Sequence, residues 1–394
     1  MKTYLALFFI FLSTFLLSCK NNEPSEINWE EFISTQIEFA VDQYQAMDKV
    51  LPDSLTPRTF ENNEFITTGT SWWCSGFYPG SLWYLYEYTE NEDLKEIAHR
   101  RSMVLEKEKN NTGTHDLGFM LYNSFGNGLR LTGNEDYKDI LLIGAESLMT
   151  RYNENVGCIR SWDHGDWEFP VIIDNMMNLE YLLWASRIAG KQDYYDKSIS
   201  HTEKTLKNHY RPDHSSFHLV NYDTITGEVL GKQTVQGFSD ESAWARGQVW
   251  GLYGFLTVYR DTRDEKYLDH VQSITSFLIN HPNYPENGVP YWDFNAPDIP
   301  NAKRDASAGA IMASALLELS GYVNQEDSTK YVDIAKKILY SLATEYRASE
   351  VGDNGYFILK HSVGHLPGNS EVDVPLTYAD YYFIEALLRL KRMI

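Results

Sequence analysis

Cysteine and positive charge are both scarce in this chain of 394 residues. It has three cysteines, and 34 lysines and arginines stand against 55 aspartates and glutamates, which gives a formal net charge of −21. This acidity argues against a nucleic-acid binder, which normally has a basic footprint. It also argues against non-specific adhesion to anionic membranes or polysaccharides. An anionic substrate would therefore need a few local cations and donors to hold it.

Proline and glycine, with 13 and 25 residues, are too few for a fibrous or low-complexity chain. Cys74 and Cys158 are too few for a disulfide framework, and either one bond or two free buried thiols fits the sequence. There is no CxxC motif or Cys/His cluster to indicate zinc. The motifs HExxH, GxxxxGK(S/T), GxGxxG and GxSxG are also missing, which argues against zinc hydrolases, nucleotide enzymes and serine esterases.

The first 19 residues are typical of an export signal. Lys2 precedes an apolar run over residues 4–17, which is shorter than the roughly 20 residues that a membrane span needs. The run ends at Leu-Leu-Ser-Cys, which resembles a bacterial lipoprotein box with Cys19 as the lipidated residue; an ordinary signal peptide is the alternative. We expect a lipoprotein signal peptide at 1–19, a tether at 20–27 and one domain at 28–394, exported to the periplasm or outer membrane and lipid-anchored to a bacterial membrane.

Amphipathic segments recur at the helical period after the tether. Twelve helices are predicted, over residues 29–51, 79–89, 94–108, 117–131, 135–152, 174–189, 192–209, 242–260, 265–279, 306–320, 328–344 and 378–393. Short loops alternate with long connections rich in glycine, aspartate and tryptophan. This alternation predicts an all-α fold, a six-hairpin α/α toroid with its long loops on one rim. Residues 218–235 are predicted to form a small hairpin in one long loop, and two helical subdomains are the alternative to a single domain.

Two carboxylates, Asp116 and Asp174, lie at the starts of predicted helices. Each is also typical of a helix cap, which would stabilise by about 0.5–2 kcal/mol and have no chemical role. Asp174 follows the apolar run Phe-Pro-Val-Ile-Ile, and burial there would raise its pKa, whereas a helix N-terminus would lower it. The sequence alone does not decide whether the pKa of Asp174 is raised or lowered. General acid–base work requires two carboxyls in distinct environments.

Other polar and aromatic side chains accompany the carboxylates in the long connections. His115 and His218 are candidates for the site, although structural histidines are more common. Arg246 is a candidate to bind a carboxylate in bidentate fashion, with a surface ion pair as the alternative. Tryptophans are candidates to stack on sugar rings, or else belong to the core; they are Trp72, Trp162 and Trp250.

From about residue 30 to the end, the chain resembles the unsaturated glucuronyl hydrolases of glycoside hydrolase family eighty-eight, and five motifs in the family's order carry the resemblance. They are Trp-x-x-Gly-Phe-x-Pro-Gly from Trp73, His115-Asp116-x-Gly-Phe, Ile173-Asp174-Asn175-Met176-Met177-Asn178, Ala245-Arg246-Gly247-Gln248-x-Trp250-Gly251 and Asp380-Tyr381-Tyr382. A single motif would be weak evidence for the family, but five motifs in the same order are specific to it. The resemblance implies the same α/α toroid that the helix pattern predicts.

The resemblance also implies an activity and a set of site residues. The family removes a 4,5-unsaturated uronic acid from oligosaccharides left by polysaccharide lyases, here glycosaminoglycan fragments, by hydrating the double bond. Asp174 matches the general acid/base and Asp116 the second acid of the family. No metal or organic cofactor is implied. Residues that match positions lining the uronide are Trp73, His115, Trp162, His218, Gln236, Arg246 and Trp250, with Arg246 and His218 as candidates for its carboxylate.

Three alternative functions stay open on the sequence. An unsaturated galacturonyl (rhamnogalacturonyl) hydrolase would use the same chemistry on pectin fragments. A non-catalytic sugar-binding lipoprotein would explain the tether and the tryptophans, but not the carboxylates at two helix starts. A sugar epimerase on the same barrel would rely on paired histidines. The sequence also leaves the oligomeric state and the sulfation preference open, although residues 360–370 lie where the family recognises the next sugar.

Overall fold

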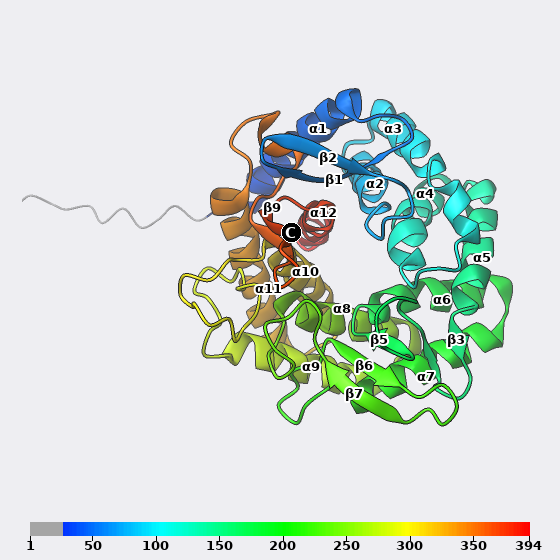
Figure 1. Cartoon of the computed structure of the whole chain (residues 1–394). Helices are drawn as coiled ribbons and strands as arrows, with labels where there is room; N and C mark the ends of the chain where they lie inside the picture. The colour runs from blue at the N-terminus through cyan, green and yellow to red at the C-terminus, as the bar shows by residue number, and fades with distance from the viewer. Residues whose placement is uncertain (1–26) are drawn as a thin grey trace, which may run out of the picture.

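The computed structural model describes residues 27–394; Cys19, the predicted signal peptide and the tether up to residue 26 lie outside the described residues. Two rings of helices surround a central axis (Figure 1). Each inner helix contacts the next, and the last contacts the first, so the inner ring is closed. Its members are α2 (Phe77–Thr89), η2 (Gly118–Gly126) continuing into α4 (Asn127–Thr132), α6 (Asn175–Ala189), α8 (Ala245–Thr262), α10 (Ala306–Leu319) and α12 (Thr377–Lys391).

Each inner helix packs chiefly against one outer helix, and this arrangement confirms the predicted six-hairpin toroid. The inner helices are buried along most of their length, whereas the outer helices bury one face and expose the other, as the helical periodicity predicted. The outer helices are α1 (Trp29–Val50), α3 (Glu92–Met103), α5 (Glu135–Met149), α7 (Gln192–Asn208), α9 (Glu265–Asn280) and α11 (Gln325–Ser341).

Side-chain caps are more frequent in the outer ring, although α7 of the outer ring lacks one and α10 of the inner ring is capped by Asp305. The outer helices α3, α5, α9 and α11 begin at Asn91, Asn134, Asp264 and Asn324, whose side chains accept a hydrogen bond from a backbone N–H in the first turn. In the described chain, the inner helices α6, α8 and α12 begin without a side-chain cap. The side chain of Asp174, which precedes α6, is therefore not used as a helix cap.

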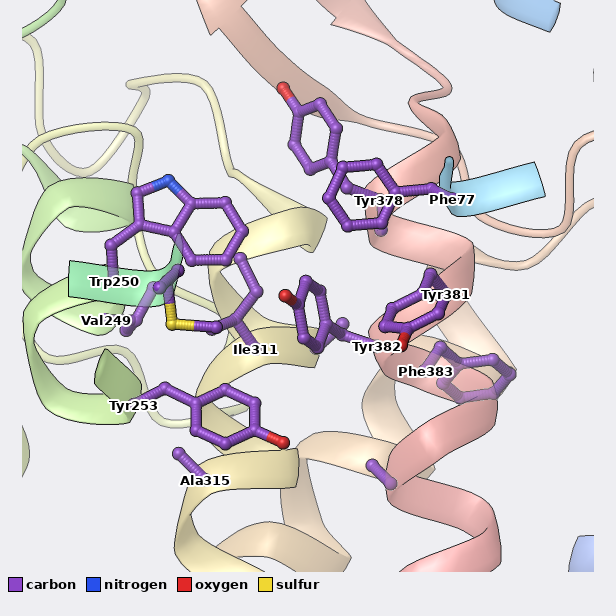
Figure 2. Close-up of a cluster of buried hydrophobic side chains, with 14 of the residues drawn as sticks. Phe77, Val249, Trp250, Tyr253, Ile311, Ala315, Tyr378, Tyr381, Tyr382 and Phe383 are labelled. Carbon is purple, nitrogen blue, oxygen red and sulfur yellow. The ribbon is translucent and has the colours of Figure 1, made fainter. Parts of the chain in front are cut away.

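Aromatic side chains from α8 and α12 pack with the apolar side chains Ile311 and Ala315 of α10 in a buried cluster (Figure 2). The ring of Tyr382 lies 5.5 Å from that of Trp250 and 5.8 Å from that of Tyr253, in edge-to-face geometry. Such pairs contribute about 0.5–1.5 kcal/mol each beyond the area they bury. The inner helices are thereby held at fixed distances, which fixes where their N-terminal ends lie.

Short β-hairpins extend from the long connections. The predicted hairpin at 218–235 is confirmed as β6 and β7, and β5 joins it to form a three-stranded antiparallel sheet. The hairpins β1–β2 and β8–β9 were not predicted. The strands are β1 (Thr56–Glu61), β2 (Glu64–Thr68), β3 (Tyr152–Asn153), β4 (Cys158–Ile159), β5 (Pro170–Ile172), β6 (Leu219–Tyr222), β7 (Val229–Gln233), β8 (Ser362–His365) and β9 (Ser370–Val374).

Several of the predicted helices differ in detail from the structure. The helix predicted at 94–108 ends at Met103, and a separate 3₁₀ turn, η1 (Glu106–Asn110), follows it. The helix predicted at 117–131 begins as the wider π-helical turn η2. Cys74 and Cys158 are both free and buried in the described part of the chain. Among residues 27–394, every helix is too short or too polar to cross a membrane.

Candidate active site

Strand register brings Asp174 next to His218. In β5, Ile172 pairs with Leu219 of β6, and the N–H of Ile173 donates to the carbonyl of His218 at 2.9 Å. Asp174 follows directly, at the start of α6, and its Oδ2 lies 3.9 Å from Nε2 of His218. The β5–β6 pairing and the start of α6 therefore place a carboxyl and an imidazole in contact at the rim.

Burial decides the pKa of Asp174. The residue is 7% exposed, and Oδ2 has no hydrogen-bond partner among residues 27–394. Burial raises the pKa of this carboxyl from 3.8 to about 7; the charge of Arg246 lowers it, and the charge of Asp116 raises it. Desolvation disfavours the charged form and here outweighs the stabilisation expected from the helix terminus. A carboxyl that keeps its proton near neutral pH can act as a general acid.

Asp116 lies in the turn that leads into η2. The hydroxyl of Thr114 donates to Oδ2 of Asp116 at 3.0 Å. Nδ1 of His115 lies 2.7 Å from the carbonyl of Ser161 and must carry a proton, because a carbonyl only accepts. Nε2 of His115 lies 3.2 Å from Oδ1 of Asp116. Burial lowers the pKa of His115, while the carboxylate of Asp116 acts in the opposite direction.

His218 is held as a neutral donor that faces Asp174. Its Nδ1 accepts hydrogen bonds from the N–H groups of Val235 at 3.0 Å and Gln236 at 3.3 Å, so the proton lies on Nε2. Burial lowers the pKa of His218 well below its usual value. Nε2 and Oδ2 of Asp174 are both buried without a hydrogen-bond partner in the described chain. Buried polar groups are normally paired, so these two atoms mark a position for a polar ligand.

Gln236 and Arg246 converge on strand β8. Nε2 of Gln236 donates to the carbonyl of Gly364 at 3.0 Å, and Nη2 of Arg246 donates to the same oxygen at 2.8 Å. Nη1 of Arg246 donates to the carbonyl of Val363 and lies 3.6 Å from Oδ2 of Asp305. Arg246 is therefore used to hold the β8–β9 hairpin against α8. Its contact with a substrate carboxylate stays a prediction.

The predicted tryptophans lie in different surroundings. Trp162 lies in the loop between β4 and β5, with its ring 6.5 Å from that of His218. The ring of Trp73 packs 4.9 Å from Tyr378. Trp250 is fully buried and packs 5.1 Å from Phe119 in the core. The structure thus places Trp162 near His218, whereas Trp250 is a core residue in this conformation.

Ser161 and Asp305, which were not predicted as site residues, contribute to the structure around the two carboxyls. The Ser161 hydroxyl donates to Oδ1 of Asn175 at 2.8 Å and accepts from the N–H of Ile172 at 2.9 Å. Oδ1 of Asp305 caps α10 through the N–H of Ser307, at 3.0 Å. Two signals could have indicated them, since Ser161 adjoins Trp162 in a polar cluster and Asp305 immediately precedes a helix. No sequence motif, however, distinguishes a serine or an aspartate with these contacts from any other.

A separate cavity of about 400 Å³ runs along the axis of the ring. Phe119 and Met177 line it near the rim, and Arg130 lines it towards the C-terminal ends of the inner helices, whereas Asp116 and Asp174 lie outside it. Its charges are largely paired, as in the bond from Arg260 to Glu318 at 3.1 Å. No cluster of three or more potential metal-binding His, Cys, Asp or Glu side chains occurs within residues 27–394.

A closed toroid of helix pairs with two electrostatically coupled carboxyls is an α/α barrel with a candidate site for general acid–base catalysis. Residues 46–387 match the family model described as Glycosyl Hydrolase Family 88. The chain is 48% identical over 325 residues to the unsaturated glucuronyl hydrolase of Formosa agariphila, covering 82% of this chain and 80% of that one. The chain belongs to glycosyl hydrolase family 88, so the predicted family and enzyme class are confirmed.

Solved structures agree with this assignment. A crystal structure of an unsaturated glucuronyl hydrolase specific for heparin matches with a TM-score of 0.90 and 44% identity, over 92% of this chain and 98% of that one. A variant of the unsaturated glucuronyl hydrolase from Streptococcus agalactiae, complexed with dGlcA-GalNAc6S, matches with a TM-score of 0.80 and 30% identity, over 93% of each chain.

Proposed function

We propose that this chain removes a 4,5-unsaturated uronic acid from lyase-generated glycosaminoglycan oligosaccharides, with Asp174 as the general acid and base. The observation that carries the proposal is the buried, unpaired carboxyl of Asp174 with a pKa of about 7, beside the unpaired donor of His218. Ordinary glycosidases use two carboxyls at a set spacing around the anomeric carbon. A vinyl ether instead needs an acid at one carbon and a water molecule at its neighbour, and a single carboxyl can serve both steps.

In the proposed reaction, Asp174 gives its proton to carbon 4, and the ring oxygen stabilises the positive charge that develops at carbon 5. The resulting carboxylate accepts a proton from water while the water oxygen bonds to carbon 5, so Asp174 regains its proton. The hemiketal then opens: the bond between carbon 5 and the ring oxygen breaks, carbon 5 becomes a ketone, and its hydroxyl proton passes to the former ring oxygen. The hemiacetal thus formed at carbon 1 expels the aglycone, which leaves with the hydroxyl proton as an alcohol, and carbon 1 becomes an aldehyde. The negative charge of Asp116, next to Asp174, favours the protonated acid at the start of the cycle.

The proposed substrate class rests on the relatives. One matched structure is of an enzyme specific for heparin, and another is complexed with dGlcA-GalNAc6S. The substrate's carboxylate and hydroxyls would satisfy the unpaired groups near Asp174. We propose that the residues which bind the uronide are Trp73, His115, Trp162, His218, Gln236 and Arg246. The predicted role of Trp250 is not retained, because this residue is fully buried in the core.

A panel of lyase-generated disaccharides tests the proposal. The protein is incubated with unsaturated disaccharides from heparin, chondroitin and pectin, and the ultraviolet absorbance of the double bond is followed. We expect the absorbance to disappear with at least one glycosaminoglycan disaccharide and to persist with the galacturonyl-rhamnose disaccharide. Persistence with every disaccharide would contradict the proposed activity, and loss with the pectin disaccharide alone would reassign the substrate.

We also propose that the protein is an exported bacterial lipoprotein anchored through Cys19 in the periplasm or at the outer membrane. The support is the short apolar run over residues 4–17, which ends at Leu-Leu-Ser-Cys. In a bacterial host, the wild-type protein should sediment with membranes, and Cys19→Ser should release it into the soluble fraction. Membrane association that persists in the variant would contradict lipidation at this residue.

A further inference from the structure

Ser161 is hydrogen-bonded through every polar group that it has. It is 1% exposed, and its N–H donates to the carbonyl of Pro170 at 2.8 Å, which ties it to β5. Its carbonyl lies 2.7 Å from Nδ1 of His115, and its hydroxyl bonds both Asn175 and Ile172. One buried serine thus connects the turn that precedes Asp116 to both sides of Asp174.

These contacts bear directly on the placement of the two carboxyls. Oδ2 of Asp174 has no hydrogen-bond partner in the described chain, so the position of this carboxyl depends on the backbone that carries it. That backbone lies between Ile172 and Asn175, the two residues that the Ser161 hydroxyl binds. The side-chain amide of Asn175 also donates to the carbonyl of Ile159 at 2.8 Å. The other carboxyl, Asp116, adjoins the histidine whose ring the Ser161 carbonyl orients.

We propose that Ser161 is a positioning residue for the reaction: its carbonyl orients His115 beside Asp116, and its hydroxyl fixes the segment that carries Asp174. It thereby sets the separation of the two acids without touching the substrate. The inference rests on the proposed function of this site. Because catalysis requires reacting groups to be held in a productive geometry, a displacement of about 1 Å can reduce the rate about a hundredfold.

If Ser161 positions Asp174, the loss of its hydroxyl should change the pH dependence of activity, because the charge state of Asp174 depends on the groups around it. The charges that act on Asp174 come from Arg246 on α8 and from Asp116 in the turn before η2. The imidazole of His218, just before β6, also faces Asp174. Removing the Ser161 hydroxyl leaves space and two unpaired polar groups beside the Asp174 segment. Water that enters there would hydrate the carboxylate and favour its charged form. The alkaline limb of the pH profile, which is the range in which activity falls as the pH rises, should therefore move to lower pH.

The test compares Ser161→Ala and Ser161→Thr with Ser198→Ala as a matched control. Ser198 is also fully buried, but its hydroxyl donates to the carbonyl of Tyr194 within α7, away from the site. We expect Ser161→Ala to lower kcat about 10- to 100-fold, to leave KM nearly unchanged and to move the alkaline limb to lower pH. Ser161→Thr, which keeps the hydroxyl, should recover most of kcat and the original limb. Ser198→Ala should keep the wild-type kcat and the wild-type alkaline limb.

A second variant keeps the proposal testable if Ser161→Ala fails to fold. Asn175→Ala removes the same contact from the other side and should shift the alkaline limb in the same direction. Wild-type kcat and an unmoved limb in a folded Ser161→Ala or Asn175→Ala variant would overturn the role of Ser161. The proposed function would survive that result if Asp174→Asn were inactive in the same assay, whereas a wild-type protein without turnover would refute the proposed function itself.

Discussion

Replacing Asp174 by asparagine should abolish turnover and stabilise the protein. The substitution keeps the size and planarity of the side chain but removes its titratable proton. In the proposed reaction the carboxyl acts first as an acid and then as a base, so both steps lose their catalyst. General acid–base catalysis by one group contributes about 10²–10⁴-fold, and we expect kcat to fall by about 10³-fold or more. Substrate binding should persist, because the donors around the site remain.

The stability change follows from the pKa of Asp174. Its pKa rises from 3.8 to about 7 in the folded protein, so the folded state binds the proton more tightly than the unfolded state does. The stability that this proton provides is fully present below pH 3.8 and is lost as the pH rises through about 7. At about 1.4 kcal/mol per pKa unit, the stability lost relative to low pH is about 4 kcal/mol at pH 8, where Asp174 is ionised in both states, and about 2 kcal/mol at pH 5, where only the unfolded state is ionised.

Asparagine carries no such ionisation cost. The difference in unfolding free energy between Asp174→Asn and the wild type should therefore increase by about 2–3 kcal/mol from pH 5 to pH 8. Urea denaturation at both pH values measures this, calorimetric titration with substrate measures binding, and the absorbance assay measures turnover. Asp139→Asn, at an exposed position on α5, is the control and should change none of the three. Near-normal turnover, or a stability difference that is the same at both pH values, would refute the reasoning.

The remaining predictions concern the surroundings of Asp174. Wild-type kcat/KM should fall as the pH rises through about 7, and Asp116→Asn should move that limb to lower pH because the negative charge that raises the pKa of Asp174 is removed; a limb that moves up would contradict the coupling. Arg246→Ala should raise KM for the charged substrate, and an unchanged KM would exclude Arg246 from the carboxylate site. The same variant should lose about 3–5 kcal/mol of stability in denaturation, because Asp305 would remain buried without its cation. Trp162→Ala should raise KM with little change in kcat, and the opposite pattern would show that this ring does not bind the substrate.

The fold was accessible from the sequence because its periodicity and loop lengths are local properties. Apolar residues at helical spacing predicted the helices, and the alternation of short and long connections predicted the ring. The unpredicted hairpins β1–β2 and β8–β9 are short segments in which burial is decided by the surrounding helices. The π-helical start of η2 likewise depends on packing, since the backbone at Gly118 lies against Asn178 of α6.

Only part of the site could be predicted from the sequence. The motifs predicted Asp174 and Asp116, but the sign of the pKa change at Asp174 required its burial to be known, because the helix terminus acts in the opposite direction. The guanidinium of Arg246 was predicted to bind a carboxylate, yet its Nη groups bind carbonyls of β8, a strand that the sequence did not indicate. Ser161 acts partly through its backbone carbonyl, which every residue has, so residue type could not reveal it.

The most direct test of the account compares two signals in one reaction of the wild-type protein with an unsaturated glycosaminoglycan disaccharide. Stopped-flow absorbance follows the double bond, and rapid-quench NMR follows release of the second sugar. If Asp174 protonates carbon 4 and water adds at carbon 5, the double bond must disappear before the sugar is released, or together with it. Release of the sugar while the absorbance persists would mean attack at the anomeric carbon, and would contradict the proposed mechanism.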